Sequence, residues 1–134
     1  MENFNGEIWK PVVGYEDYYE CSNLGRVRSV DRYVKGKTHQ DKQLKVGKIK
    51  DPIKDSKGYL RVYLWKENKR KLYRIHHLVA YAFPEICGEW FEGAEIDHIN
   101  TVITDNRAIN IKWVTHTQNM NNPLTIENRK RLSL

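Results

Sequence analysis

Four polar residues in the last third of the sequence have side chains suited to metal-assisted chemistry. Asp97 and His98 are adjacent, Asn110 follows twelve residues after His98, and Asn119 lies 22 residues after Asp97. A carboxylate and an amide offer oxygen ligands, the type that Mg²⁺ and Mn²⁺ prefer. Two such ligands leave positions on an ion open for phosphate oxygens and water. A divalent ion held in this way stabilises the charge that grows on a phosphodiester under attack.

His98 suits the role of general base, because imidazole has an ordinary pKa of about 6.5. Neighbouring side chains on a strand point to opposite sides, so the imidazole would face an attacking water while Asp97 holds the ion. Asn110 ends the intervening loop and could bond across it to hold the strands and the histidine. On these residues alone the alternative remains open that Asp97 and His98 bond to backbone and that Asn110 is a turn residue.

The pattern around these residues predicts strand, loop, strand and helix. EIDHI (95–99) and IKWVT (111–115) are expected as short strands on either side of a polar loop. Thr115 or Thr117 could cap a final helix of about two turns that Pro123 stops. This ββα arrangement can hold one metal ion between a strand end and a helix. In the loop, Asp105 and Asn106 are expected only to shape the turn.

Two hairpins and a helix are expected before this unit. YYECSNLGRVRSV (18–30) contains a turn cluster in which Gly25 is free to adopt positive φ. A second hairpin follows Gly58, where apolar and polar residues alternate in YLRVYLW (59–65). The segment 34–58 is predicted as a polar loop or ragged extended stretch. HHLVAYAF (76–83) has helical spacing that ends at Pro84. The sequence therefore predicts an α+β fold.

Composition narrows the function classes. The 134 residues fit one compact domain, or a core module with an appendage. A formal net charge of +6 favours a polyanionic partner without proving one. No apolar run approaches the roughly 20 residues of a membrane helix, which predicts no membrane partner. Cys21 and Cys87 are far apart and no secretory segment opens the chain, so an intracellular location is expected. Structural zinc is disfavoured because close pairs of cysteine ligands are lacking.

The ordered set of motifs resembles the HNH nuclease family, in the subgroup with Asp-His first and Asn last. The matching residues are Asp97-His98, Asp105-Asn106-Arg107, Asn110 before IKWVT, and Asn119. RIHHLVAYAF (74–83) resembles the helix before the motif. IWKPVVGYEDYYECSNLGRVRSV (8–30) resembles the N-terminal module of phage and intron-encoded homing endonucleases. Together these stretches cover most of residues 8 to 122.

The resemblance implies an N-terminal β-hairpin module followed by a ββα-metal (His-Me finger) nuclease core. It implies DNA cleavage with a single Mg²⁺ or Mn²⁺, with Asp97 and Asn119 as metal ligands, His98 as general base and Asn110 as orienter. We divide the chain into a DNA-contacting hairpin module with linker (6–58), the nuclease core (59–122, with the ββα unit at 95–122) and a basic tail (123–134). The residues expected to contact DNA are Arg26, Arg28, Arg61, His76 and Arg107.

The sequence departs from the family pattern in the loop after Asp-His-Ile-Asn. Glycine is usual there, whereas this chain has Thr101-Val102-Ile103. β-Branched residues tolerate positive φ poorly, so we expect a different loop path. We also expect the protein to lack the long C-terminal DNA-binding extension of larger homing enzymes. Site specificity is therefore expected to be low or supplied by a partner.

The expected partner is double-stranded DNA, bound by a monomer or homodimer, with a phage packaging protein as a further candidate. A monomer has one site and should nick one strand per encounter. The resemblance implies that the cut leaves a 5′-phosphate and a 3′-hydroxyl. RNA cleavage would use the same chemistry. The expected location is the cytoplasm of a bacterial host, with the gene carried by a phage or mobile element. The alternative function is a catalytically silent DNA-binding or packaging accessory protein with the same fold.

Overall fold

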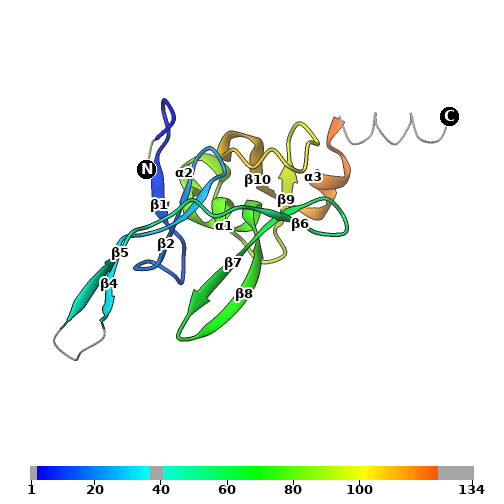
Figure 1. Ribbon diagram of the computed structural model, residues 1–134. Coiled ribbons are helices and arrows are strands. Elements are labelled where there is room, and N and C mark those ends of the chain that lie inside the picture. Colours follow the sequence, from blue (N-terminus) through cyan, green and yellow to red (C-terminus); the bar gives the residue numbers. More distant parts are fainter. Residues whose placement is uncertain (1–2, 37–40, 124–134) are drawn as a thin grey trace.

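The computed structural model describes residues 3–36 and 41–123 (Figure 1). Short antiparallel sheets surround one central helix, α1 (Ile75–Ala82). Strands precede the helix and a ββα unit follows it, so the predicted α+β class is confirmed. No helix in the described ranges is long and apolar enough to cross a membrane.

The N-terminal sheet consists of β1 (Trp9–Pro11), β2 (Tyr19–Ser22) and β3 (Val27–Ser29), with β2 in the middle. The predicted hairpin is therefore present as β2 and β3. Gly25 in its turn has a φ of 86°, a left-handed conformation that favours glycine. The apolar side of the sheet faces the core through residues such as Cys21 and Val27.

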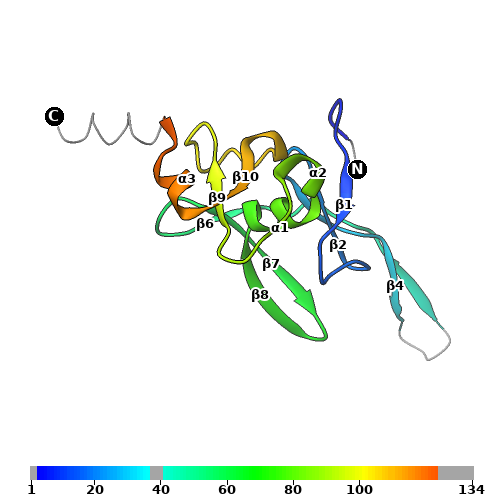
Figure 2. The ribbon, with the colours of Figure 1, turned by 180° about the vertical axis from the view of Figure 1, so that it is seen from behind.

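A two-stranded ribbon follows, formed by β4 (Arg32–Lys35) and β5 (Lys42–Lys45). It projects away from the rest of the molecule on the side opposite α3 (His116–Met120) (Figures 1 and 2). Apart from the half-buried Val34, its strand residues are exposed. The sequence predicted a polar loop or a ragged extended stretch for 34–58. The structure instead has two regularly paired strands here, although almost none of their side chains enter the core.

The second predicted hairpin is confirmed as β7 (Leu60–Lys66) and β8 (Lys69–Arg74), with the short β6 (Ile53–Lys54) along the outer edge of β7. Glu67 and Asn68 form the tight turn, and both have positive φ. Two residues with positive φ give the turn a twist that matches the twist of the flanking strands. Val62 and Leu64 point into the core, as their alternation predicted.

Helix α1 ends at Ala82, with Phe83 as its C-cap, and Pro84 begins the short α2 (Pro84–Cys87). Proline lacks a backbone N–H, so it cannot continue one helix but suits the first turn of the next. One hydrophobic cluster includes residues of the N-terminal sheet, β7, α1 and the ββα unit. Cys21 and Cys87 are buried in this cluster, and burial raises the pKa of their thiols to about 12 and about 11.

The last unit consists of β9 (Glu95–His98), the single turn η1 (Ala108–Asn110), β10 (Ile111–Val114) and α3. The two strands pair antiparallel, with Lys112 opposite Asp97. Thr115 caps α3, and its hydroxyl and the Gln118 side chain satisfy each other's backbone N–H groups. Helix α3 ends at Met120, three residues before Pro123. The predicted tail beyond residue 123 lies outside the described residues.

Candidate active site

The face of β9 that carries Asp97 is covered by polar side chains from α3 and the turn after it. Glu95 and Asp97 are two residues apart, so their side chains share this face. Asn119 donates from Nδ2 to Glu95 Oε1 at 3.0 Å. Asn122 donates from Nδ2 to both oxygens of Asp97, at 3.0 and 2.8 Å. The two predicted ligands Asp97 and Asn119 therefore lie on one face, and each hydrogen-bonds a different partner.

Sequence reasoning missed Glu95 and Asn122. Asn122 follows Asn119 by three residues, a spacing that puts two side chains on one side of a helical turn. That spacing was the available signal. Glu95 also accepts from His116, whose Nδ1 lies 2.8 Å from Oε2. Hydrogen bonds from Asn119 and then His116 hold the pKa of Glu95 below its usual value.

The donor set on this face fits a hard divalent cation. It contains carboxylate oxygens and amides, and no group of three or more His, Cys, Asp or Glu in the described ranges is arranged to enclose a metal. One carboxylate with one or two amide oxygens makes an incomplete shell. Such a shell suits Mg²⁺ or Mn²⁺, because either ion can complete its coordination with water and phosphate oxygens.

His98 is the last residue of β9, and its ring lies on the face opposite Asp97. The side chain is only 7% exposed. Its Nε2 lies 3.0 Å from Asn106 Oδ1. Asn106 was expected only to shape the loop, and its contact with His98 went unforeseen because nothing in the sequence distinguishes it from other loop asparagines.

His76 lies beneath His98. The two rings are 4.8 Å apart between centroids, and Tyr59 packs against both. Burial, followed by the proximity of His77 and His98, lowers the pKa of His76 to about 3, so its ring is neutral at neutral pH. We expected His76 to contact DNA, but with 4% exposure the ring supports the site from inside. The neighbouring His77 is the exposed histidine.

Asn110 joins the two ends of the loop between β9 and β10. Its Oδ1 accepts from the backbone N–H of Asn100 and its Nδ2 donates to the carbonyl of Asp105, both at 2.9 Å. The Asn110 carbonyl also accepts from the N–H of Ile99. These contacts have the geometry expected of a residue that holds the loop against the strands.

The conformation of Thr101 differs from the expectation that β-branched residues in this loop avoid positive φ. Thr101 adopts positive φ, at 64°, despite its β-branched side chain. Asn100 stabilises this conformation, because its Oδ1 accepts from the N–H of Val102 in an Asx turn. The N–H of Thr101 also donates to the carbonyl of His98. The loop thus keeps a left-handed residue where the family usually has glycine, and local hydrogen bonds oppose the strain.

Two sequence families match the chain in order. Residues 7–65 match the NUMOD4 motif and residues 73–121 match the family described as HNH endonuclease. The DNA endonuclease I-HmuI of Bacillus phage SP01 is 36% identical over 117 residues, which are 87% of this chain and 58% of that enzyme. The chain is therefore homologous to I-HmuI over these residues, and its residues 73–121 are similar to the HNH endonucleases.

Two further comparisons agree. An uncharacterised HNH endonuclease of Acanthamoeba polyphaga mimivirus is 33% identical over 136 residues, which cover 92% of this chain and 29% of that protein. A solved structure titled "DNA binding and cleavage by the HNH homing endonuclease I-HmuI" matches with a TM-score of 0.67 and 29% identity, over 94% of this chain and 59% of that one. The chain thus spans less than two thirds of the length of these HNH relatives.

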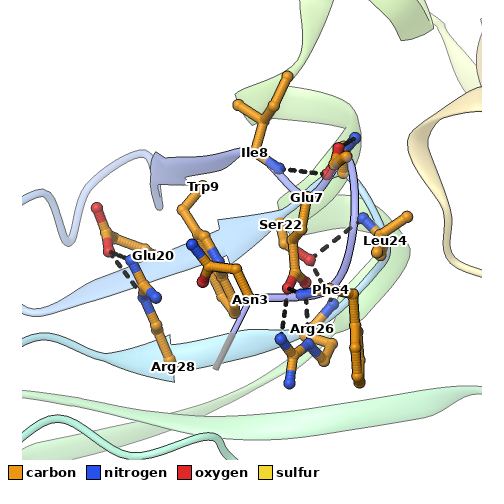
Figure 3. Close-up of polar contacts among 12 residues, drawn as sticks. Asn3, Phe4, Glu7, Ile8, Trp9, Glu20, Ser22, Leu24, Arg26 and Arg28 are labelled. Carbon is orange, nitrogen blue, oxygen red and sulfur yellow. Dashed lines mark hydrogen bonds and ion pairs between the residues drawn. The ribbon is translucent and has the colours of Figure 1, made fainter. Parts of the chain in front are cut away.

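Two of the arginines expected to contact DNA lie in the β2–β3 hairpin and are paired with carboxylates (Figure 3). Arg26 forms an ion pair with Glu7, and Arg28 forms one with Glu20 at 2.8 Å. The guanidinium of Arg28 also stacks over the Trp9 ring, 3.9 Å from its centroid. These pairings reduce the positive charge that the two side chains present to a phosphate.

The two other arginines expected to contact DNA are Arg107, in the loop between β9 and β10, and Arg61, in β7. Arg107 forms a two-bond contact with Asp105, with both distances 2.8 Å, and its side chain remains 48% exposed. These bonds from Arg107, opposed by partial burial, hold the pKa of Asp105 at about 2. Arg61 is half-buried and donates to the carbonyl of Lys54 at 3.3 Å.

Proposed function

We propose that this chain is a metal-dependent DNA endonuclease that hydrolyses phosphodiester bonds. The observation that carries the proposal is the arrangement at the end of β9. Asp97 faces the amides that follow β10, and His98, the next residue, has its ring on the other face beside Asn106. The proposed metal ligand and the proposed base are thus neighbours in the chain, which supports a site where both act on one phosphodiester.

His98 accepts the proton of the attacking water in this mechanism. Asp97 and Asn119 are the proposed ligands of one Mg²⁺ or Mn²⁺, and Asn122 is the amide that already contacts Asp97. The bound ion would stabilise the negative charge on the phosphate and polarise its oxygens. Asn110 keeps the loop in register, so that His98 and Asp97 hold their relative positions. The product ends are a 5′-phosphate and a 3′-hydroxyl.

Double-stranded DNA is the proposed substrate, and the exposed, cationic β4–β5 ribbon is the surface proposed to bind it. Arg32 lies opposite Lys45, and Lys35 lies opposite Lys42. Like charges in direct cross-strand pairs repel each other, and a polyanion between them removes that cost. A groove beside the ribbon includes Lys48 and the aromatic ring of Tyr63 among its lining residues. Arg107 and Arg61 are proposed as further contacts nearer the site.

Supercoiled plasmid provides the test. Incubation with Mg²⁺ or Mn²⁺ should convert it to nicked circles, and EDTA should prevent this. One site per monomer predicts nicks before linear product. A gel shift without cutting, under all metal conditions, would favour the catalytically silent DNA-binding protein and contradict the proposed activity. The same assay with His98→Ala separates a genuine product from a contaminating nuclease.

A further inference from the structure

Asn106 is the direct hydrogen-bond partner of the proposed base. Its Oδ1 lies 3.0 Å from His98 Nε2, and the Asn106 side chain is almost fully buried. An amide oxygen can only accept, so this contact requires a hydrogen on Nε2. A neutral imidazole carries one hydrogen, which leaves Nδ1 as the unprotonated nitrogen. A base that takes a proton from water at Nδ1 needs this tautomer.

The N-terminal sheet holds Asn106 in place. A Cβ atom on Gly25 would lie 2.8 Å from the Asn106 carbonyl oxygen and 2.9 Å from its carbonyl carbon. The turn between β2 and β3 therefore packs directly on the backbone of Asn106. Next to this contact, the N–H of Ala108 donates to the carbonyl of Asn23 at 2.8 Å. The NUMOD4 segment thus contacts the nuclease loop at the residue that bonds His98.

We propose that Asn106 is a positioning residue that fixes His98 as the Nε2–H tautomer, and that the β2–β3 turn keeps Asn106 in that position. The inference rests on the proposed role of His98. It adds a link between two segments of the chain that match separate families.

One end of the buried Asn106 amide, its Nδ2, has no hydrogen-bond partner among the described residues. An unsatisfied buried donor is unfavourable, so a loop residue selected only for its turn geometry has no reason to carry one. With Oδ1 beside His98, Nδ2 is the atom left unpaired, and the measured tautomer of His98 tests this orientation. The reverse orientation of the amide would place a donor against Nε2 and require the opposite tautomer.

The first experiment measures the tautomer itself. Nitrogen-15 and carbon-13 chemical shifts of the His98 ring, recorded on the metal-free protein near pH 8, should show Nε2 protonated and Nδ1 bare. Asn106→Leu removes the acceptor and should give a mixture of tautomers. Asn106→Asp restores an acceptor oxygen and should restore the Nε2–H form. A predominant Nδ1–H form in the native protein, or an unchanged ring signature in Asn106→Leu, would overturn the proposal.

Kinetics supply a second readout. Asn106→Leu should lower kcat by at least about tenfold while KM for plasmid changes less than about twofold, because His98 is misaligned but the DNA-binding surface is intact. Asn106→Asp should recover most of that loss. The same Asn-to-Asp change at the exposed Asn5 controls for charge and should leave kcat unchanged. Equal losses in the Leu and Asp variants would argue against a role for the acceptor oxygen.

Two glycines with similar backbone conformations allow a controlled test of the link to the N-terminal sheet. Gly25 and Gly14 have φ values of 86° and 89°, so alanine is similarly strained at both. A Cβ at Gly14 meets nothing within 4 Å, whereas one at Gly25 meets Asn106. Gly25→Ala should therefore perturb the His98 ring signature, and Gly14→Ala should not. If both variants leave it unchanged, the turn does not hold Asn106.

These measurements can fail separately from the proposed activity. The ring signature requires neither metal nor DNA. Intact plasmid together with an Nε2–H tautomer that depends on Asn106 would refute the nuclease function and leave the structural link standing. Nicked plasmid together with unchanged His98 ring chemical shifts in Asn106→Leu would support the nuclease function and refute the structural link.

Discussion

Asn122 Nδ2 lies 2.8 and 3.0 Å from the two carboxylate oxygens of Asp97, a closer link to Asp97 than any that Asn119 makes among the described residues. The amide hydrogens of Asn122 and a cation therefore compete for the same oxygens. Asn119 is the proposed metal ligand, whereas Asn122 is a hydrogen-bond donor to the other proposed ligand, Asp97.

Removal of the two asparagines one at a time should have opposite effects on metal affinity. Asn119→Ala should weaken Mn²⁺ binding by about tenfold, because a ligand oxygen is lost. Asn122→Ala should tighten it several-fold, because Asp97 no longer has to break hydrogen bonds. Isothermal calorimetry on the DNA-free protein measures both, with Asp97→Ala as the variant that should bind no ion at this site. If Asn122→Ala abolishes binding instead, Asn122 is the ligand and Asn119 is not.

His98→Ala should lose cleavage by about 10² to 10⁴-fold, the range typical of a missing general base. DNA affinity should stay within about twofold, because the buried ring contributes little surface. Plasmid nicking and fluorescence anisotropy measure the two properties. His77→Ala, at the neighbouring exposed histidine, is the control and should keep most activity. Full activity in His98→Ala would remove His98 from the mechanism.

Lys42→Glu should have opposite effects on the ribbon and on DNA binding. Glutamate opposite Lys35 replaces repulsion with attraction, worth about 0.2 to 1 kcal/mol, so ribbon amides should exchange more slowly with solvent. DNA affinity should fall, and the slope of its logarithm against the logarithm of salt concentration should shrink by about one. Lys57→Glu makes the same charge change at an exposed turn and is the control. Equal losses of affinity in both variants would indicate general charge alone.

Glu7→Gln tests the ion pair with Arg26. Hydrogen bonds from Arg26 lower the pKa of Glu7 to about 2, so the carboxylate is more stable in the folded chain than in the unfolded one. That contribution is complete above about pH 4.5 and disappears as the pH falls toward 2. Glu7→Gln should therefore lower the free energy of unfolding by about 2 kcal/mol at pH 7 and by little near pH 2. Urea titrations at several pH values measure this, with Glu89→Gln as control. A loss that does not depend on pH would assign the effect to packing.

The sequence was most informative where local chemistry decides the outcome. Alternation placed Val62 and Leu64 in the core, Pro84 ended α1, and Thr115 capped α3, because each depends on a few neighbouring residues. It was least informative where residues distant in the sequence meet. The contact of Gly25 with Asn106 and the pairing of Arg26 with Glu7 depend on how separate segments pack, and neither leaves a periodic signal.

Thr101 shows a different limit. The propensity argument treated positive φ as a property of the residue, whereas the Asx turn at Asn100 and the bond to the His98 carbonyl decide the conformation. For Asn106 the residue type permitted many roles, and only the fold shows which atom it presents to His98.

The shared hydrophobic cluster has a consequence for dissection of the protein. Val12, Tyr19 and Val27 from the NUMOD4 segment pack in the same interior as Val79, Ile111 and Trp113 from the HNH unit. Division of the chain between residues 65 and 73 would separate the two family matches. Each fragment would then expose the apolar surface that the other fragment covers in the intact protein. A segment that replaces one half by recombination must therefore have an apolar surface that fits the other half. Without that fit, we expect the hybrid protein to aggregate before it can bind DNA.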